Sequence, residues 1–125
     1  MTARILFTPP DDLDLATVHT TQAGRYRVEL TPNEAGKPPI GPIHRWTIVV
    51  RTPDGRPVEK ASITIDGGMP QHGHGFPTAP RVTREIGGGA YLVDGMKFSM
   101  TGWWTLTVKV DAEAGTDEAT FNIVL

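Results

Sequence analysis

Two runs near the C-terminus decide the fold: Trp103-Trp104-Thr105-Leu106-Thr107-Val108-Lys109-Val110 and Phe121-Asn122-Ile123-Val124-Leu125. In each run every second residue is apolar, the spacing that places alternate side chains on one face of a β-strand. The segment between them, Asp111 to Thr120, is acidic and contains glycine, so we expect an exposed hairpin loop there. The two runs therefore predict a pair of antiparallel strands with one face buried.

The same alternation recurs along the earlier part of the chain, and no window shows an apolar stripe of helical period. The predicted strands are 26–30, 46–50, 61–65, 82–86 and 91–93, with a further strand in 13–20 and an optional edge strand at 5–8. Seven to eight short strands separated by turns are typical of two packed sheets. We predict an all-β, immunoglobulin-like antiparallel β-sandwich that forms a single domain over residues 1–125.

One segment is too rich in proline to be a central strand. Thr31 to Ile43 contains four prolines, and proline cannot donate a hydrogen bond to a neighbouring strand. We interpret this segment as an extended crossover between the two sheets.

Composition excludes several classes of function. Lysine and arginine number 12 against 14 acidic residues, with both signs scattered, which argues against nucleic acid as a partner because nucleic acid selects basic stripes. Cysteine is absent, so there is no disulfide, no thiolate nucleophile and no cysteine-based metal site. No apolar run approaches the roughly 20 residues that span a bilayer, so we expect no transmembrane segment in this chain. The only serines, Ser62 and Ser99, lack a nearby histidine–carboxylate pairing, and we predict that the protein is not an enzyme.

Unusual chemistry is concentrated in one stretch of the second half of the chain. Apart from Met1, all the methionines lie there, together with two of the four histidines: Met69, His72, His74, Met96 and Met100. Thioether sulfur is a soft ligand that suits Cu(I), and neutral imidazole suits copper and zinc alike. In an extended backbone His72 and His74 share one face, and Met96 and Met100 share another. This combination points to copper before any other metal.

Structural interpretations of the same residues stay open. A His-Gly-His sequence in a glycine-rich loop also fits an exposed turn, and methionine commonly fills irregular gaps in a core. Met100, beside Trp103-Trp104, fits a packing role. His44 is either a third imidazole for the site or a partly buried histidine that bonds a backbone carbonyl. We interpret His19 as an ordinary surface residue.

This region contains the short motifs Met69-Pro-Gln-His-Gly-His-Gly75, Thr78-Ala-Pro-Arg-Val82, Gly89-Ala-Tyr-Leu-Val93, Gly95-Met-Lys-Phe98 and Met100-Thr-Gly-Trp-Trp104. Together they resemble the YtkA-like domain family, which is related to FixH-type proteins and is sometimes labelled auxin-binding. The resemblance runs from about Ile43 to the C-terminus and is weak upstream of it. It implies a periplasmic or otherwise extracytoplasmic, immunoglobulin-like β-sandwich, of a kind usually exported or tethered to a bacterial membrane, with a role in copper handling or cytochrome oxidase assembly. It also implies Met69, His72, His74, Met96 and Met100 as the ligands, although Ser99 stands where the family pattern has histidine.

Two classes of function follow. The first is a non-catalytic copper-binding domain that holds or delivers copper, with a protein partner in copper delivery or oxidase assembly. The alternative is a protein-interaction module of a membrane-associated complex that binds no metal and contacts its partner through the glycine-rich loop and the Trp103-Trp104 corner. Adjacent tryptophans on one strand point to opposite faces, so we expect only one of them to enter the core. A small-ligand pocket between the sheets is a weaker form of this alternative.

Overall fold

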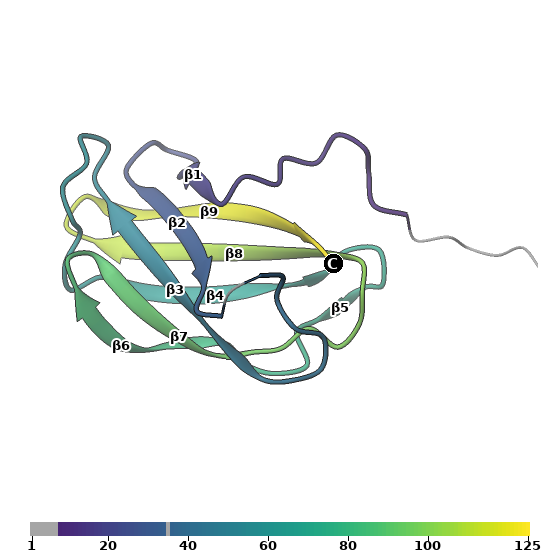
Figure 1. Cartoon of the computed structure of the whole chain (residues 1–125). Coiled ribbons are helices and arrows are strands. Elements are labelled where there is room, and N and C mark those ends of the chain that lie inside the picture. Colours follow the sequence, from purple (N-terminus) through teal and green to yellow (C-terminus); the bar gives the residue numbers. More distant parts are fainter. Residues whose placement is uncertain (1–7, 35) are drawn as a thin grey trace, which may run out of the picture.

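The computed structural model describes residues 8–34 and 36–125, which form nine strands and no helix. The strands are β1 (Val18–Thr20), β2 (Arg27–Pro32), β3 (His44–Arg51), β4 (Ser62–Met69), β5 (His74–Gly75), β6 (Arg81–Gly87), β7 (Ala90–Met96), β8 (Trp103–Ala112) and β9 (Gly115–Val124). They pair into a larger sheet of order β1-β2-β3-β7-β6 and a smaller sheet of order β5-β4-β8-β9. The two sheets face each other as layers (Figure 1), so the predicted all-β antiparallel β-sandwich is confirmed.

The core forms where the alternating apolar residues of the two sheets meet. On β8, Trp104, Leu106, Val108 and Val110 are at most 2% exposed, while their neighbours along the strand point outward. Trp104 is buried and Trp103 is only partly buried, with its indole N–H donating to the Asn122 Oδ1 at 3.0 Å. The expectation that the two tryptophans take opposite faces is therefore confirmed.

Three features of the fold differ from the predictions. The hairpin loop expected at 111–120 is mostly strand, because β8 and β9 pair through to Ala112 and Gly115 and their polar side chains occupy the outer face. The proline-rich segment joins β2 to β3, which are neighbours in the same sheet, so its interpretation as a crossover between sheets was wrong. The two-residue strand β5 lies in the predicted glycine-rich loop. The optional strand at 5–8 falls almost entirely outside the described residues.

Across the described ranges, no helix is long and apolar enough to cross a lipid bilayer.

A buried carboxylate joins the two sheets at the end of the sandwich away from β5. Asp117 on β9 is 8% exposed, and its oxygens accept backbone N–H groups of Ala23 at 2.9 Å and Arg25 at 3.2 Å in the β1–β2 connection. Burial alone raises the pKa of Asp117. Hydrogen bonds from the Thr21 side chain and from the backbone of Ala23, Arg25 and Glu118 outweigh burial and lower the pKa to about 2.

This carboxylate predicts an acid-sensitive contribution to stability. Its folded-state pKa lies below the ordinary value of 3.8, so the stabilisation is present above about pH 4 and is lost as the pH falls towards 2. Asp117→Asn should lower the midpoint of thermal unfolding at pH 7, and the difference from the unmodified protein should shrink between about pH 4 and 2. Glu113→Gln, in the exposed turn of the same hairpin, is the matched control for loss of charge. A difference that stays constant across this pH range would contradict the assignment.

Candidate metal centre

The centre is built on a tight turn between β4 and β5. The carbonyl oxygen of Met69, the last residue of β4, accepts the backbone N–H groups of His72 at 3.1 Å and Gly73 at 3.0 Å. This turn brings His74 directly opposite Met69 in the antiparallel register. Opposed residues of an antiparallel pair project from the same face of the sheet with Cβ atoms about 4.5–5.5 Å apart. The side chains of Met69 and His74 therefore leave the smaller sheet on the same side, Met69 into the core and His74 at its exposed edge.

The two imidazoles of the turn lie close together. The ring centroids of His72 and His74 are 5.7 Å apart, with His72 partly buried and His74 exposed. The Nδ1 of His74 is 3.0 Å from the carbonyl oxygen of Gly75, and a carbonyl can only accept, so in the neutral ring the proton sits on Nδ1. The Nε2 of His74 then carries the lone pair that a metal ion requires.

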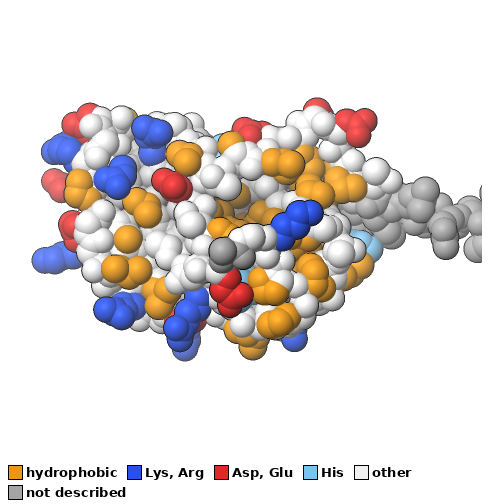
Figure 2. Space-filling view, in the orientation of Figure 1, with side chains coloured by type: hydrophobic (Ala, Val, Ile, Leu, Met, Phe, Trp, Pro, Cys, Tyr) orange, Lys and Arg blue, Asp and Glu red, His pale blue; other side chains and the backbone are white. Residues whose placement is uncertain are grey.

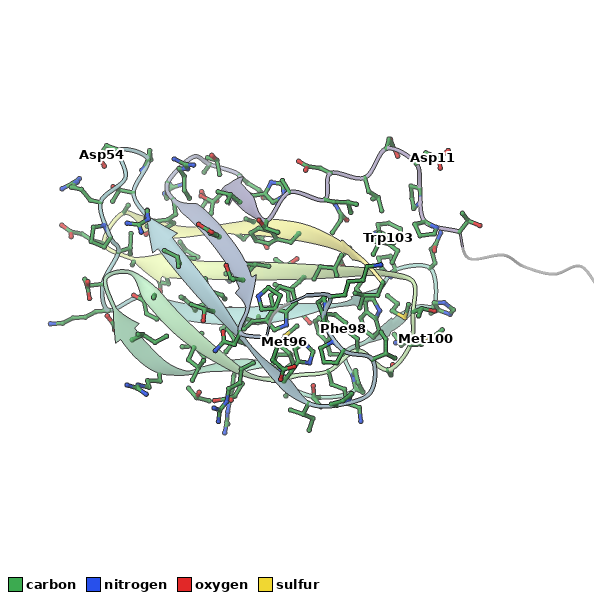
Figure 3. The ribbon with its side chains drawn as sticks, viewed as in Figure 1. Asp11, Asp54, Met96, Phe98, Met100 and Trp103 are labelled. Carbon is green, nitrogen blue, oxygen red and sulfur yellow. The ribbon has the colours of Figure 1, made fainter. Side chains whose placement is uncertain are left out.

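The methionine thioethers differ in their exposure. Met69 is 1% exposed, and its Cε methyl reaches the β7–β8 connection, where a Cβ added at Gly102 would lie 2.7 Å from it. Met100 in that connection is 38% exposed and lies at the same end of the sandwich as β5 (Figure 3). We call the region that contains His72, His74 and Met100 at the surface and Met69 in the core the tip.

Met96 stands apart from the tip. It is the last residue of β7 in the larger sheet, is fully buried, and pairs in register with His44 of β3. Figure 3 places Met96 and Phe98 further towards the middle of the sandwich than Met100. The strand register thus forms two cross-strand Met–His pairs, Met69 with His74 and Met96 with His44.

Aromatic rings connect the two pairs. Trp104 packs edge-on against His74 with centroids 6.0 Å apart and against Phe98 at 5.2 Å. Phe98 in turn packs against His44 at 5.5 Å. Four rings from four segments therefore run from the tip into the core.

Among the described residues, no group of three or more His, Cys, Asp or Glu side chains is placed to hold a metal ion. The side-chain donors at the tip are imidazole and thioether, a combination that favours a soft or borderline ion over Mg²⁺, Ca²⁺ or Mn²⁺.

A second surface feature lies away from the imidazoles of the tip. An apolar groove of about 520 Å³ opens between the sheets beside β2 and β9, with Leu30, Trp46 and Phe121 among its lining residues and Lys37 at its rim. In the face shown in Figure 2, hydrophobic side chains gather near the C-terminal end of β9, and most basic side chains lie at the opposite end of the sandwich. A tightly packed core predicts no such space between the sheets, so the sandwich is less closely packed beside β2 and β9 than expected.

The environments of His44 and His19 are more complex than the sequence indicated. His44 is 4% exposed, and its Nδ1 lies 3.2 Å from the carbonyl oxygen of Pro42, the backbone contact that one interpretation predicted. The sequence did not reveal that Met96 is its cross-strand partner. His19 is also partly buried: its side chain is 21% exposed and packs against Phe121 with centroids 4.8 Å apart.

Comparison with known proteins gives one match. The family model described as YtkA-like matches residues 20–109. The chain belongs to the YtkA-like family. The match begins upstream of Ile43, where the sequence resemblance seemed weak, and ends before β9. No curated protein and no solved structure matches the chain.

The turn predicts a strict requirement for glycine at position 68. Gly68 has φ +154°, and a Cβ there would lie 2.2 Å from the His74 carbonyl oxygen, so a side chain cannot fit without moving β5. Gly68→Ala should lower stability by about 1–3 kcal/mol and shift the imidazole NMR signals of His72 and His74. Gly73→Ala is the control, since its Cβ meets nothing within 4 Å and costs only the backbone strain of φ +68°. Equal shifts in both variants would contradict the packing argument.

Proposed function

We propose that this protein is a non-catalytic, extracytoplasmic copper-binding domain that holds or delivers one copper ion at the tip. The observation that carries the proposal is the cross-strand pair of Met69 and His74, with the ring of His72 5.7 Å from that of His74. Membership of the YtkA-like family agrees with the proposal but names no metal. Copper homeostasis and oxidase assembly, with a protein partner that receives the ion, are the settings we infer.

The chemistry of the donors favours copper. Thioether sulfur contributes little to Zn²⁺ or Mg²⁺ binding but stabilises Cu(I), and imidazole binds both oxidation states of copper. A site that combines both donors can therefore hold copper through a change in its oxidation state. His72, His74, Met69 and Met100 are the tip residues that supply these donors.

The exposure of the tip suits exchange of an ion with a partner. His74 is exposed and Met100 is 38% exposed, so an incoming ligand can reach an ion held there. Met69 is buried opposite His74 in the strand register, so we infer that its thioether would be the fixed ligand of the site. A resident structural ion is normally closed off by its ligands, whereas an open edge of this kind fits temporary holding.

A copper titration tests the proposal. The intact protein and the variant His72→Ala/His74→Ala/Met69→Leu are titrated with Cu(II), and with Cu(I) without oxygen against a competing chelator. Leucine at position 69 removes the sulfur and keeps the volume of a buried side chain. The variant should bind one equivalent less copper than the intact protein. His19→Ala removes an imidazole outside the tip and should bind as the intact protein does. Equal binding by the intact protein and the triple variant would end the proposal.

One observation favours the alternative, an interaction module. Trp103 is only partly buried and pairs in register with Val124, which is 38% exposed, beside the equally exposed Met100. Partly exposed tryptophan is enriched at protein–protein contacts. On this alternative, Trp103→Ala abolishes a partner contact while copper titration of the intact protein gives no binding.

A further inference from the structure

His44 is a buried polar residue opposite a buried thioether. It begins β3, is 4% exposed, and lies in register with Met96, which is fully buried. Because directly opposed residues of an antiparallel pair share a face, both side chains enter the core next to each other. The β3–β7 register shifts between His44 and Trp46, and such a bulge re-aims a side chain relative to a regular strand.

The hydrogen bonding of His44 selects one tautomer. Its Nδ1 is 3.2 Å from the carbonyl oxygen of Pro42, which can only accept, so in the neutral ring Nδ1 carries the proton and Nε2 the lone pair. Nε2 is buried, and within the described residues no hydrogen-bond partner reaches it. A metal-binding histidine commonly shows this arrangement, with one ring N–H fixed on a carbonyl and the other nitrogen presented to the ion.

The surroundings of this pair favour a soft ion of low charge. The ring of His44 packs against Phe98 at 5.5 Å and Trp46 at 6.3 Å, so its neighbours are aromatic. Transfer of an ion into an apolar interior costs free energy that rises with the square of its charge, so a monovalent ion is favoured over a divalent one. Imidazole and thioether together select Cu(I) among monovalent ions.

We propose that the Nε2 of His44 and the Sδ of Met96 form a second, internal site for Cu(I). The choice of copper rests on the function proposed above, whereas the donor pair rests on its own geometry. The competing occupant is a water molecule. The Trp46 Nε1–H is also buried with no partner among the described residues, and one water could bridge that donor and the Nε2 of His44.

The matched control is His19. Its Nε2 is likewise buried with no partner in the described part of the chain, but its cross-strand partner is Val28 instead of a methionine. His19→Gln therefore removes a partly buried imidazole whose Nε2 has no partner among the described residues, without touching a thioether. If an imidazole of this kind were enough to bind Cu(I) without a thioether, His19→Gln would also bind one equivalent less than the intact protein.

The test is a Cu(I) titration without oxygen of the full chain in five forms: intact, His72→Ala/His74→Ala, Met96→Leu, His44→Gln and His19→Gln. Met96→Leu removes the sulfur and keeps the volume, and thermal unfolding checks that each variant is folded. We expect two equivalents for the intact protein and for His19→Gln, and one for each of the other three. X-ray absorption at the copper edge of the His72→Ala/His74→Ala variant should show one sulfur and one imidazole nitrogen.

The outcomes separate this site from the tip. If the His72→Ala/His74→Ala variant binds no Cu(I), or if Met96→Leu binds as the intact protein does, the internal site is overturned and the copper function of the tip survives. If His72→Ala/His74→Ala loses nothing while His44→Gln and Met96→Leu each lose an equivalent, the tip assignment fails and the internal site stands. If the intact protein binds no copper in either oxidation state, both are overturned. Addition of Ag(I), which mimics Cu(I), should shift the Nε2 NMR signal of His44 in a folded intact protein and leave that of His19 unchanged.

Discussion

The burial of Trp104 is the constraint on which the end of the sandwich with the tip depends. Its indole ring stacks on Phe76 at 5.5 Å, meets Phe98 edge-on at 5.2 Å and meets His74 at 6.0 Å, while its N–H donates to the Met100 carbonyl oxygen at 3.1 Å. These partners come from β5, the segment after it and the β7–β8 connection, which share no regular strand pairing with one another. One side chain thus positions both chain segments that carry the candidate ligands, so the geometry of the tip and the packing of the core cannot vary independently.

The sandwich could be predicted because its core follows one rule. A period of two in apolar residues marks every strand that has a buried face, and β8 shows it with Trp104 and its successors. The same rule fails where a strand is too short to show a period and has no buried residue. β5 is two residues long and exposed, and its pairing with β4 requires that residue 68 has no Cβ. In a sequence, glycines at these positions indicate a loop. The ends of β8 and β9 were predicted as loop for a related reason, because polar residues on the outer face of a strand resemble the residues of a loop.

The candidate ligands show where sequence reasoning stops. Proximity in sequence correctly predicted that Met69, His72 and His74 lie in one short segment of the tip, because a tight turn closes that segment on itself. It could not assign Met96, since the partner of Met96 is chosen by the pairing of β7 with β3. His44 lies far away in sequence, and only strand register brings it opposite a thioether. Burial of both sulfurs was equally hidden, because methionine has the same appearance in a sequence whether it fills a core or binds an ion.

The two Met–His pairs share a donor set but differ in solvent, and solvent decides which charge each can hold. At the tip, water reaches His74 and Met100 and can solvate a divalent ion, so imidazole donors there can accommodate both oxidation states of copper. Around His44 and Met96 the aromatic rings offer no such solvation, so oxidation of an ion held there to the divalent state would be disfavoured. With the proposed assignments, the tip, where His74 and Met100 are open to solvent, would bind copper in either oxidation state, and the interior pair would retain it only when reduced. The same types of ligand would then take up copper at the tip and retain it in the interior, and the difference would come from burial alone.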